Sequence, residues 1–460
     1  MRDAFPRKIN SDCRVRNWRS FYLAESIGLC VFIHRIGLAL VVDGQCYGYN
    51  IGVLQFFHVS NQVGSSLGTD FLYIRSQESL QQLCEQLEKE SLISFDTEFV
   101  AEDSYRPLLC LLQVATENHI AIIDPLEIDD LSVFWNLLVD PERTVIVHAG
   151  REEILFCYRA TGKRIPNLFD IQVAAGFNGF EYPASYGKLV QRIVGKTLDK
   201  EETRSDWRHR PLSTQQLEYA AQDVRDLIRI YKHLSEKLRK HGRLTWLAEE
   251  THLRQEELSE LESSENWHRL SGISALSGQA LSIARGLWSW RDNRARERNL
   301  PPRKILRDDL IIELARRGSA DPRRVSALRG MEYRNTRQLI PELSNVIEDS
   351  IKHPPPAWPR KHRYGKGQPA SMLTQFLSAA MAFICHQKHM APMLVATSDD
   401  LRDFVQYRLS SESDPDNPPS LLKGWRADIV GRELDDLLDG KLAIVLDDPH
   451  SEIPIKFIET

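Results

Sequence analysis

Two acidic residues stand two positions apart directly after a short apolar run. The run covers Leu92 to Phe95, and Asp96 and Glu98 follow it. If the run is a buried strand, its period of two sends both carboxylates to one face. Neighbouring anions repel each other unless a cation joins them, and hard cations such as Mg²⁺ or Mn²⁺ prefer oxygen ligands. The pattern therefore indicates either a metal-binding pair or a solvated strand end, because D-x-E after a strand is common.

Two further segments carry carboxylates in a pattern that suits chemistry. Tyr219 and Asp223 are four positions apart, so on a helix they are neighbours on one face and place a phenol beside a carboxylate. The alternative is a core tyrosine next to a surface aspartate. Glu152 and Glu153 begin a predicted helix directly after Gly150. Acidic residues at a helix start are also simply favoured by the helix dipole.

The elements that must position these residues follow from apolar periodicity. The sequence predicts strands over residues 92–95, 108–114, 119–123 and 144–148, and helices over 79–91, 131–138, 152–160, 171–177, 186–194 and 215–240. Strands that cluster early and are then followed by helices indicate a mixed α/β layer fold.

The length of 460 residues suggests roughly three domains, at about 150 residues each. The predicted divisions are a leader (1–70), an α/β domain (71–245), a helical domain (280–352), a proline-rich linker (353–370), a second helical domain (371–440) and a tail (441–460). The leader is either a β-rich extension built on Val31 to Val42 and Tyr47 to Val59, or translated sequence upstream of the true start. We favour the second interpretation.

Composition narrows the class of protein. Seven cysteines include no CxxC pair, which argues against a disulfide framework or a zinc finger and favours a reducing compartment. The longest apolar stretch, Ile27 to Val42, is interrupted by His34 and Arg35, well short of the roughly 20 residues of a membrane helix. The net charge is −5, yet Arg285 to Arg329 holds 13 basic against 6 acidic residues. The net charge of the whole chain therefore conceals a basic module, although basic runs of this kind are often solvated helix faces.

Three motifs resemble the DEDD superfamily of 3′-to-5′ exonucleases in its tyrosine-bearing branch, and within it the ribonuclease D family. They are Ser94 to Val100, His148 to Ile154 and Tyr219 to Asp223. The spacers Ile123-Asp124-Pro125-Leu126 and Arg210-Pro211-Leu212 also resemble that family. The resemblance runs from Phe71 to Gly440. It implies a ribonuclease-H-like α/β domain, with a mixed sheet flanked by helices, followed by two all-α HRDC-like domains.

The first of these helical domains carries the basic excess. Leu287 to Arg291 and Arg294 to Pro301 resemble an HRDC domain, a module for which nucleic-acid binding is expected. The candidate contacts are Arg291, Arg294, Arg296 and Arg298, whose guanidinium groups suit phosphates and unpaired bases. The second domain contains His386 and His389, which we interpret as ordinary helix residues because no other His or Cys cluster accompanies them beyond Cys385.

The resemblance further implies hydrolysis with two divalent metal ions, Mg²⁺ or Mn²⁺, held by Asp96, Glu98, Glu153 and Asp223. In the family's mechanism Tyr219 orients the attacking water. One departure matters, because the family usually has Asp where this chain has Glu153. The extra methylene shifts the carboxylate oxygens, and a misplacement near 1 Å can cost on the order of a hundredfold in rate. Asp170 is the rival for this role, but the resemblance makes it a structural residue.

The function implied is a 3′-to-5′ exoribonuclease that releases nucleoside 5′-monophosphates, with tRNA precursors as the expected substrates. Two alternatives remain open at this point: a DNA exonuclease, and an RNA-binding protein whose Glu153 marks an impaired site. We expect a cytoplasmic protein. No segment indicates membrane association or an obligate protein partner.

Overall fold

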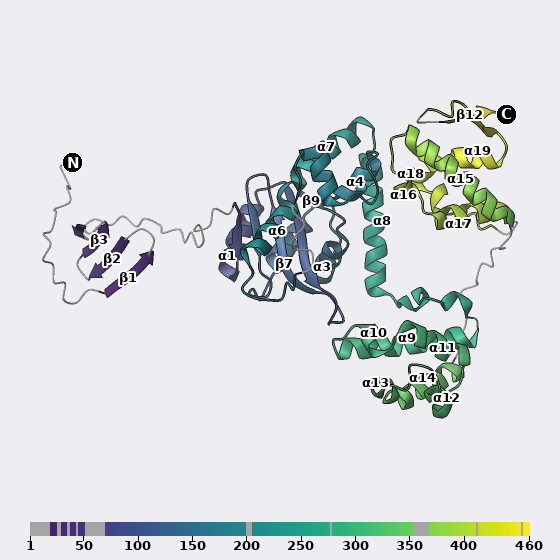
Figure 1. The fold of residues 1–460 in the computed structure, drawn as a ribbon, viewed down its shortest axis with the longest axis horizontal. Helices are drawn as coiled ribbons and strands as arrows, with labels where there is room; N and C mark the ends of the chain where they lie inside the picture. The colour runs from purple at the N-terminus through teal and green to yellow at the C-terminus, as the bar shows by residue number, and fades with distance from the viewer. Residues whose placement is uncertain are drawn as a thin grey trace. The chain divides into compact units, whose positions relative to one another are not determined.

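The computed structural model describes residues 70–198, 205–276, 278–353, 368–410, 413–451 and 454–460, together with four strands between residues 19 and 50. The chain divides into two units, Met1–Gly68 and Thr69–Thr460 (Figure 1). Within these ranges, no helix has both the length and the apolar character that crossing a membrane requires.

The first unit contains an antiparallel sheet whose strands follow chain order. Its strands are β1 (Arg19–Ala24), β2 (Leu29–His34), β3 (Gly37–Val42) and β4 (Gln45–Asn50). Four consecutive strands agree with the predicted β-rich extension. Of the predicted segment from Tyr47 to Val59, the part after Asn50 lies outside the described residues. Whether this unit precedes the true start stays a prediction.

A six-stranded mixed sheet forms the centre of the second unit, in the order β10-β9-β6-β7-β8-β5. Its strands are β5 (Leu72–Ile74), β6 (Leu92–Val100), β7 (Leu108–Ala115), β8 (Ile120–Ile123), β9 (Thr144–Val147) and β10 (Leu168–Asp170). β6 pairs antiparallel with β7 and parallel with β9. The carboxylate-bearing strand therefore lies in the middle of the sheet, where both of its edges are paired.

Helices cover both faces of this sheet, which confirms the predicted layers (Figure 1). They are α1 (Gln77–Leu87), α2 (Ser132–Leu138), α3 (Arg151–Thr161), α4 (Ile171–Phe177), α5 (Tyr186–Leu189), the π-helical turn η1 (Val190–Val194), α6 (Thr214–Arg225), α7 (Leu227–Lys240) and α8 (Leu244–Ser263). The core beneath α1, α2 and α3 includes Phe95, Phe134 and Val145, all fully buried. A second core lies under α4, α6 and α7.

The single helix predicted over residues 215–240 is two helices, α6 and α7, which break at Asp226. The Tyr186 hydroxyl donates a hydrogen bond to the Gln222 carbonyl (3.1 Å) and accepts one from the Asp226 amide (3.2 Å). This side chain replaces part of the backbone ladder at the break. Because Asp223 lies between the two bonded positions, the break fixes the end of α6 that carries it.

The first HRDC-like domain is helical and has its own apolar core. Its elements are the 3₁₀ turns η2 (Asn266–Arg269) and η3 (Ile273–Ala275), then α9 (Gln279–Glu297), α10 (Pro302–Ile305), α11 (Asp308–Arg317), α12 (Pro322–Ser326), α13 (Arg334–Arg337) and α14 (Ile340–Lys352). Ile311, Leu343 and Ile347 are completely buried in it. The predicted linker after residue 353 falls mostly outside the described residues.

The C-terminal domain is also helical, but it ends in a β-hairpin. Its elements are α15 (Gln368–Gln387), α16 (Pro392–Val395), α17 (Ser398–Leu409), η4 (Ser420–Leu422), α18 (Gly424–Arg426), η5 (Ala427–Gly431), α19 (Arg432–Leu438), β11 (Leu442–Leu446) and β12 (Ile455–Glu459). Residues 441–460, predicted as a tail, contain these two strands, and the alternating apolar residues of the hairpin pack against the helices, with the Phe457 ring 4.9 Å from the Phe383 ring.

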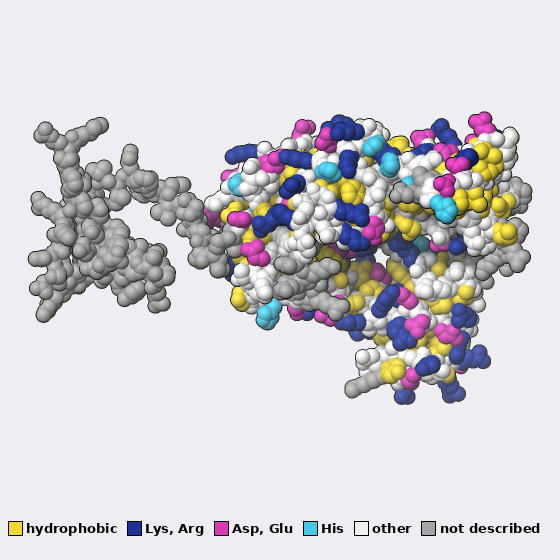
Figure 2. Space-filling view, turned by 45° about the horizontal axis from the view of Figure 1, so that its top comes forward, with side chains coloured by type: hydrophobic (Ala, Val, Ile, Leu, Met, Phe, Trp, Pro, Cys, Tyr) yellow, Lys and Arg dark blue, Asp and Glu magenta, His cyan; other side chains and the backbone are white. Residues whose placement is uncertain are grey.

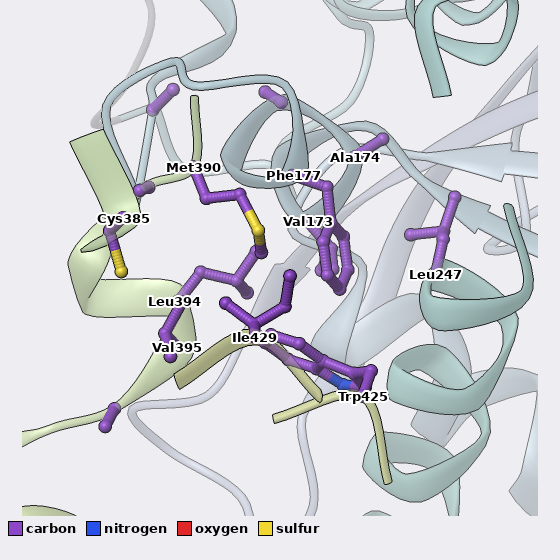
Figure 3. Close-up of a cluster of buried hydrophobic side chains, with 14 of the residues drawn as sticks. Val173, Ala174, Phe177, Leu247, Cys385, Met390, Leu394, Val395, Trp425 and Ile429 are labelled. Atoms are coloured by element: carbon purple, nitrogen blue, oxygen red, sulfur yellow. The ribbon is translucent and has the colours of Figure 1, made fainter. Parts of the chain in front are cut away.

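The C-terminal domain and the α/β domain share one continuous core, which we call the domain junction. Figure 3 shows Phe177 of α4 gathered with Leu394, Trp425 and Ile429 of the C-terminal domain. The Trp425 ring is 1% exposed, lies 4.8 Å from the Phe177 ring and donates a hydrogen bond to Glu250 of α8 (3.2 Å). The C-terminal domain is thus built into the α/β domain, whereas the first HRDC-like domain keeps a separate core.

Replacement of Trp425 by alanine is expected to destabilise the protein strongly. The change removes a fully buried ring and leaves Glu250 without one of its donors, and such truncations cost about 3–5 kcal/mol. Urea unfolding followed by far-UV circular dichroism measures the effect. Met393→Ala is the control, since Met393 is 59% exposed, and its effect should stay within about 0.5 kcal/mol. Equal midpoints for the two variants would contradict the shared core.

Candidate active site

Strand β6 presents its two carboxylates on the face covered by α6. Phe95 belongs to the core on the opposite face, and Thr97 donates a hydrogen bond to Glu153 of α3. Because side chains alternate along a strand, Asp96 and Glu98 point away from these two residues. The alternation predicted from the sequence therefore holds at this strand.

Helix α6 brings Tyr219 and Asp223 over β6, β7 and β8. It begins with a capping box between Ser213 and Gln216, which satisfies backbone donors at its first turn. Its Ala220 and Ala221 are fully buried against Cys110 and Leu111 of β7. Small residues at this contact let the helix approach the sheet closely. The larger polar side chains of the helix are left partly exposed beside β6.

A buried ion pair anchors the loop that precedes α6. Arg210 donates two hydrogen bonds to Asp124 (2.6 and 2.7 Å) and one to the carbonyl of Cys110 (2.8 Å). The Tyr73 hydroxyl also donates to Asp124 (2.7 Å). Burial alone would raise the pKa of Asp124, but the hydrogen bonds from Arg210 and Tyr73 outweigh it and lower that pKa. The loop is tied to β5, β7 and β8, which fixes where α6 starts.

Tyr219 is held by a neighbouring aromatic ring. The Trp207 ring is buried and lies 6.1 Å from the Tyr219 ring at an angle of 36°. Burial raises the pKa of Tyr219, and the charges of Asp223, Glu98 and Asp96 raise it further. The phenol therefore keeps its proton at neutral pH and acts as a hydrogen-bond donor.

Glu153 of α3 lies on the opposite face of β6, beside Thr97, and is still close enough for its charge to raise the pKa of Glu98. It is 6% exposed and lies in the first turn of the helix, next to Glu152, which pairs with Arg151. Among the described residues, the Glu153 side chain accepts a hydrogen bond from Thr97, the residue between the two carboxylates of β6. Glutamate at this position therefore reaches the back of the strand rather than pointing to solvent.

The four carboxylates raise one another's pKa. Burial raises the pKa of Glu98 to about 9, and the charges of Asp96, Asp223 and Glu153 add to the rise. Burial and then the charge of Asp223 raise the pKa of Asp96, and burial with the charge of Asp96 raises that of Glu153. Burial also raises the pKa of Asp223, which a hydrogen bond from Tyr219 partly offsets. Three separate elements thus bring like charges into one low-dielectric region.

The donor chemistry of this cluster fits a hard divalent cation. All four ligands are carboxylates, which Mg²⁺ and Mn²⁺ prefer, and a cation relieves their repulsion. Gln113 lies opposite Asp96 in the β6–β7 register, is fully buried, and both polar atoms of its amide lack a partner. Among the described residues, no three His, Cys, Asp or Glu side chains surround one point as a metal cage does.

The turn between β9 and α3 positions Glu153, and Asp170 holds that turn. Asp170 accepts hydrogen bonds from the amides of Ala149 and Gly150 (both 3.2 Å), and it caps α4 by accepting from Gln172 (2.8 Å). Ala149 adopts a φ of 55°, and a Cβ added at Gly150 would lie 2.4 Å from Val147. Asp170 is therefore occupied by backbone donors, which supports its interpretation as a structural residue.

Several residues that shape the site were not found by sequence reasoning as site residues. They are Thr97, Gln113, Tyr186, Trp207 and Arg210, quoted earlier only within motifs or not at all. Each acts through a contact between segments far apart in the chain. A local sequence pattern such as D-x-E does not reveal those contacts.

The four arginines predicted to bind nucleic acid differ in what they contact. Arg291 is 5% exposed and bonds Asp308 (2.5 Å) and the Leu306 carbonyl, so the prediction is wrong for this residue. Arg294 pairs with Glu342 (2.6 Å). Arg296 and Arg298 are exposed and stay candidates. Figure 2 shows blue Lys and Arg side chains beside magenta Asp and Glu side chains on this face of the molecule.

Arg296 also takes part in a contact between the first HRDC-like domain and the loop after β6. Its guanidinium lies 5.6 Å from the ring centre of Tyr105, whose hydroxyl bonds Asp292 (3.0 Å). In the same loop, Asp103 pairs with Lys304 of α10 (2.8 Å). Part of the basic excess of this domain is therefore used in docking to the strand that carries Asp96.

The sheet, its helices and the carboxylate group define the class of the protein. Residues 71–239 match the 3′-5′ exonuclease family, and residues 280–347 match the HRDC domain family. The α/β domain is therefore a 3′-to-5′ exonuclease domain.

Relatives of the whole chain identify the family. Ribonuclease D of Gluconacetobacter diazotrophicus is 33% identical over 386 residues, covering 82% of this chain and 95% of that protein. Ribonuclease D of Pseudomonas paraeruginosa is 31% identical over 365 residues, covering 79% and 96%. This chain belongs to the ribonuclease D family, and it is a 3′-to-5′ exoribonuclease. The relatives do not favour the two alternatives, a DNA exonuclease or an RNA-binding protein with an impaired site.

Solved structures agree with this assignment. The crystal structure of Escherichia coli RNase D, described as an exoribonuclease involved in structured RNA processing, matches with a TM-score of 0.71 and 28% identity, covering 81% of this chain and 99% of that chain. A protein from Bifidobacterium adolescentis shares the fold, with a TM-score of 0.60 and 22% identity. The predicted family and fold class are confirmed.

Asp170→Ala is expected to lower stability without changing metal dependence. The variant leaves the backbone donors of two turns unpaired, which costs about 2–4 kcal/mol. Thermal unfolding measures the loss, and the Mg²⁺ concentration for half-maximal activity should stay at the wild-type value. Glu153→Gln serves as the comparison and should raise that concentration severalfold. The reverse pattern would make Asp170, rather than Glu153, the ligand.

Proposed function

We propose that the carboxylate cluster hydrolyses the last phosphodiester bond of an RNA 3′ end and releases a nucleoside 5′-monophosphate. Asp96, Glu98, Glu153 and Asp223 hold two divalent cations, Mg²⁺ or Mn²⁺. One observation supports this most strongly: carboxylates from β6, α3 and α6 lie close enough to raise one another's pKa. Such a cluster is stable only when cations or protons neutralise it.

The roles of the residues follow from where each one lies. Asp96, on the central strand, feels the charge of Asp223 of α6 and raises the pKa of Glu153 of α3, so it is the carboxylate that we assign to both cations. Tyr219 keeps its proton and donates a hydrogen bond, so it orients the attacking water rather than deprotonating it. When bound, two cations lower the pKa of a water and stabilise the leaving 3′ oxygen. Thr97 supports Glu153 by donating a hydrogen bond to it.

Substrate and location are further parts of the proposal. RNA with a structured body and a free 3′ end, such as a tRNA precursor, is the expected substrate, because the E. coli relative is described as acting in structured RNA processing. We place the protein in the cytoplasm. Four cysteines, Cys84, Cys110, Cys157 and Cys385, are buried as free thiols, which suits a reducing compartment.

Asp96→Asn and Asp223→Asn should each abolish metal-dependent trimming of RNA 3′ ends. Either amide keeps the size of the side chain but removes the charge that a cation requires, so the rate should fall at least about a thousandfold. The assay is release of mononucleotides from 3′-labelled RNA with Mg²⁺ or Mn²⁺, and EDTA should stop it. Glu218→Gln is the matched control, because Glu218 is an exposed carboxylate of the same helix. Full activity in both test variants would refute the assignment.

Tyr219→Phe should lower kcat and leave KM for RNA nearly unchanged. Loss of the hydroxyl removes the group that orients water, and misplacement of this kind costs on the order of a hundredfold. Steady-state kinetics with a short single-stranded RNA separates the two constants. A large rise in KM with an unchanged kcat would instead assign Tyr219 to substrate binding.

A further inference from the structure

A hollow with basic walls opens at the domain junction, on a part of the surface that the active site does not use. It has a volume of about 370 Å³ and lies where α7, the turn before α8 and the end of α15 meet. Five of its eight lining residues are basic and none is acidic: Lys237, His241, Arg243, His386 and His389. Met390, drawn in Figure 3, also lines it. We call this feature the junction hollow.

Arg243 forms the inner wall of the junction hollow and carries an unneutralised charge. It is 7% exposed and donates hydrogen bonds to the carbonyls of Phe177 (2.7 Å), His389 (3.2 Å) and Lys388. Three arginines are buried among the described residues. Arg143 pairs with an aspartate at 3.1 Å and Arg291 with another at 2.5 Å, while no carboxylate pairs with Arg243. A buried cation without a counter-ion favours an anion nearby.

The outer wall of the junction hollow adds hydrogen-bond donors but no acidic side chain. Four of the basic lining residues are exposed: Lys237, His241, His386 and His389. The Lys237 ammonium lies 5.6 Å from the centre of the Phe180 ring and pairs with no carboxylate of the described residues. Two acidic side chains near these residues are already paired: Glu236 of α7 with Lys240 (2.9 Å), and Glu433 of α19 with Lys388 (2.8 Å). The junction hollow therefore presents cationic side chains and no acidic ones, with Asn178, Gly179 and Met390 as its uncharged lining residues.

Anion binding explains these histidines better than metal binding does. His386 and His389 were interpreted as ordinary helix residues, but His389 lies in the turn after α15 with a φ of 47°. The Gly179 backbone lies against this turn, since a Cβ added there would be 3.1 Å from the His389 carbonyl oxygen. Within the described ranges no metal cage of His, Cys, Asp or Glu exists. Imidazole, ammonium and guanidinium donors together suit phosphate oxygens.

We propose that the junction hollow binds a phosphate group, either of an RNA strand outside the active site or of a free nucleotide. The RNA source rests on the proposed function, whereas the phosphate chemistry does not. With RNA, the hollow would hold the backbone of the substrate body while its 3′ end is trimmed. Such contacts are electrostatic and independent of sequence.

Binding to the full chain in EDTA tests this, because no trimming takes place without divalent metal. The probes are a short single-stranded RNA and inorganic pyrophosphate. Ring resonances of labelled histidines report occupation of the junction hollow, and fluorescence anisotropy reports RNA affinity. The double variant Lys237→Gln/His386→Gln should weaken the probe that binds by roughly tenfold. Arg243 is left intact because it bonds three carbonyls of the fold.

Lys232→Gln is the matched control, since Lys232 is an exposed lysine of the same helix that does not line the junction hollow, and its partner Glu117 lies in the loop between β7 and β8. It should leave affinity within about twofold of the wild type. Histidine shifts with RNA assign the phosphate to an RNA strand, and shifts with pyrophosphate alone assign it to a free nucleotide. The proposal is overturned if neither probe shifts these resonances, or if the double variant and the control weaken binding equally. An inactive Asp96→Asn protein that still binds separates this result from the proposed function.

Discussion

Repulsion among carboxylates is the constraint on which the rest of the structure depends. β6 contributes two of them, α3 a third and α6 a fourth. Burial raises the pKa of each carboxylate and so disfavours its ionised form. A chain that places four acidic groups together must stabilise that arrangement elsewhere. The central position of β6 in the sheet, the Arg210–Asp124 ion pair and the hydrogen bonds of Tyr186 each fix one of the elements that carry the cluster.

The two helical domains relate to this scaffold in different ways. The C-terminal domain shares the core of α4 and α8 through Trp425, so its removal would expose apolar surface of the exonuclease domain. The first HRDC-like domain has its own core and meets the loop after β6 through polar contacts, including Lys304 with Asp103. Polar contacts of this kind are weakened by salt, whereas a shared apolar core is not. One domain is therefore a structural part of the enzyme, and the other is attached to it electrostatically.

Much of the fold could be predicted from the sequence, because apolar periodicity is a local property. The strand predicted over residues 92–95 is the first part of β6, which continues through Asp96 and Glu98 to Val100, and the helix carrying Tyr219 and Asp223 begins where periodicity places it. The break at Asp226, the strand β10 and the C-terminal hairpin were missed, since each depends on partners distant in the chain. For the same reason Arg291 was predicted to bind nucleic acid, because the sequence does not reveal its ion pair with Asp308. The tertiary structure decides which arginines are available to bind RNA.

The claim that the buried carboxylates require divalent cations has one direct test. Mn²⁺ is titrated calorimetrically into the metal-free full chain without RNA, and thermal unfolding is measured across the same concentrations. Binding only to the folded state raises the unfolding midpoint. About two Mn²⁺ ions should bind per chain, and the unfolding midpoint should rise with the Mn²⁺ concentration. No measurable binding, together with a midpoint that does not move, would contradict it.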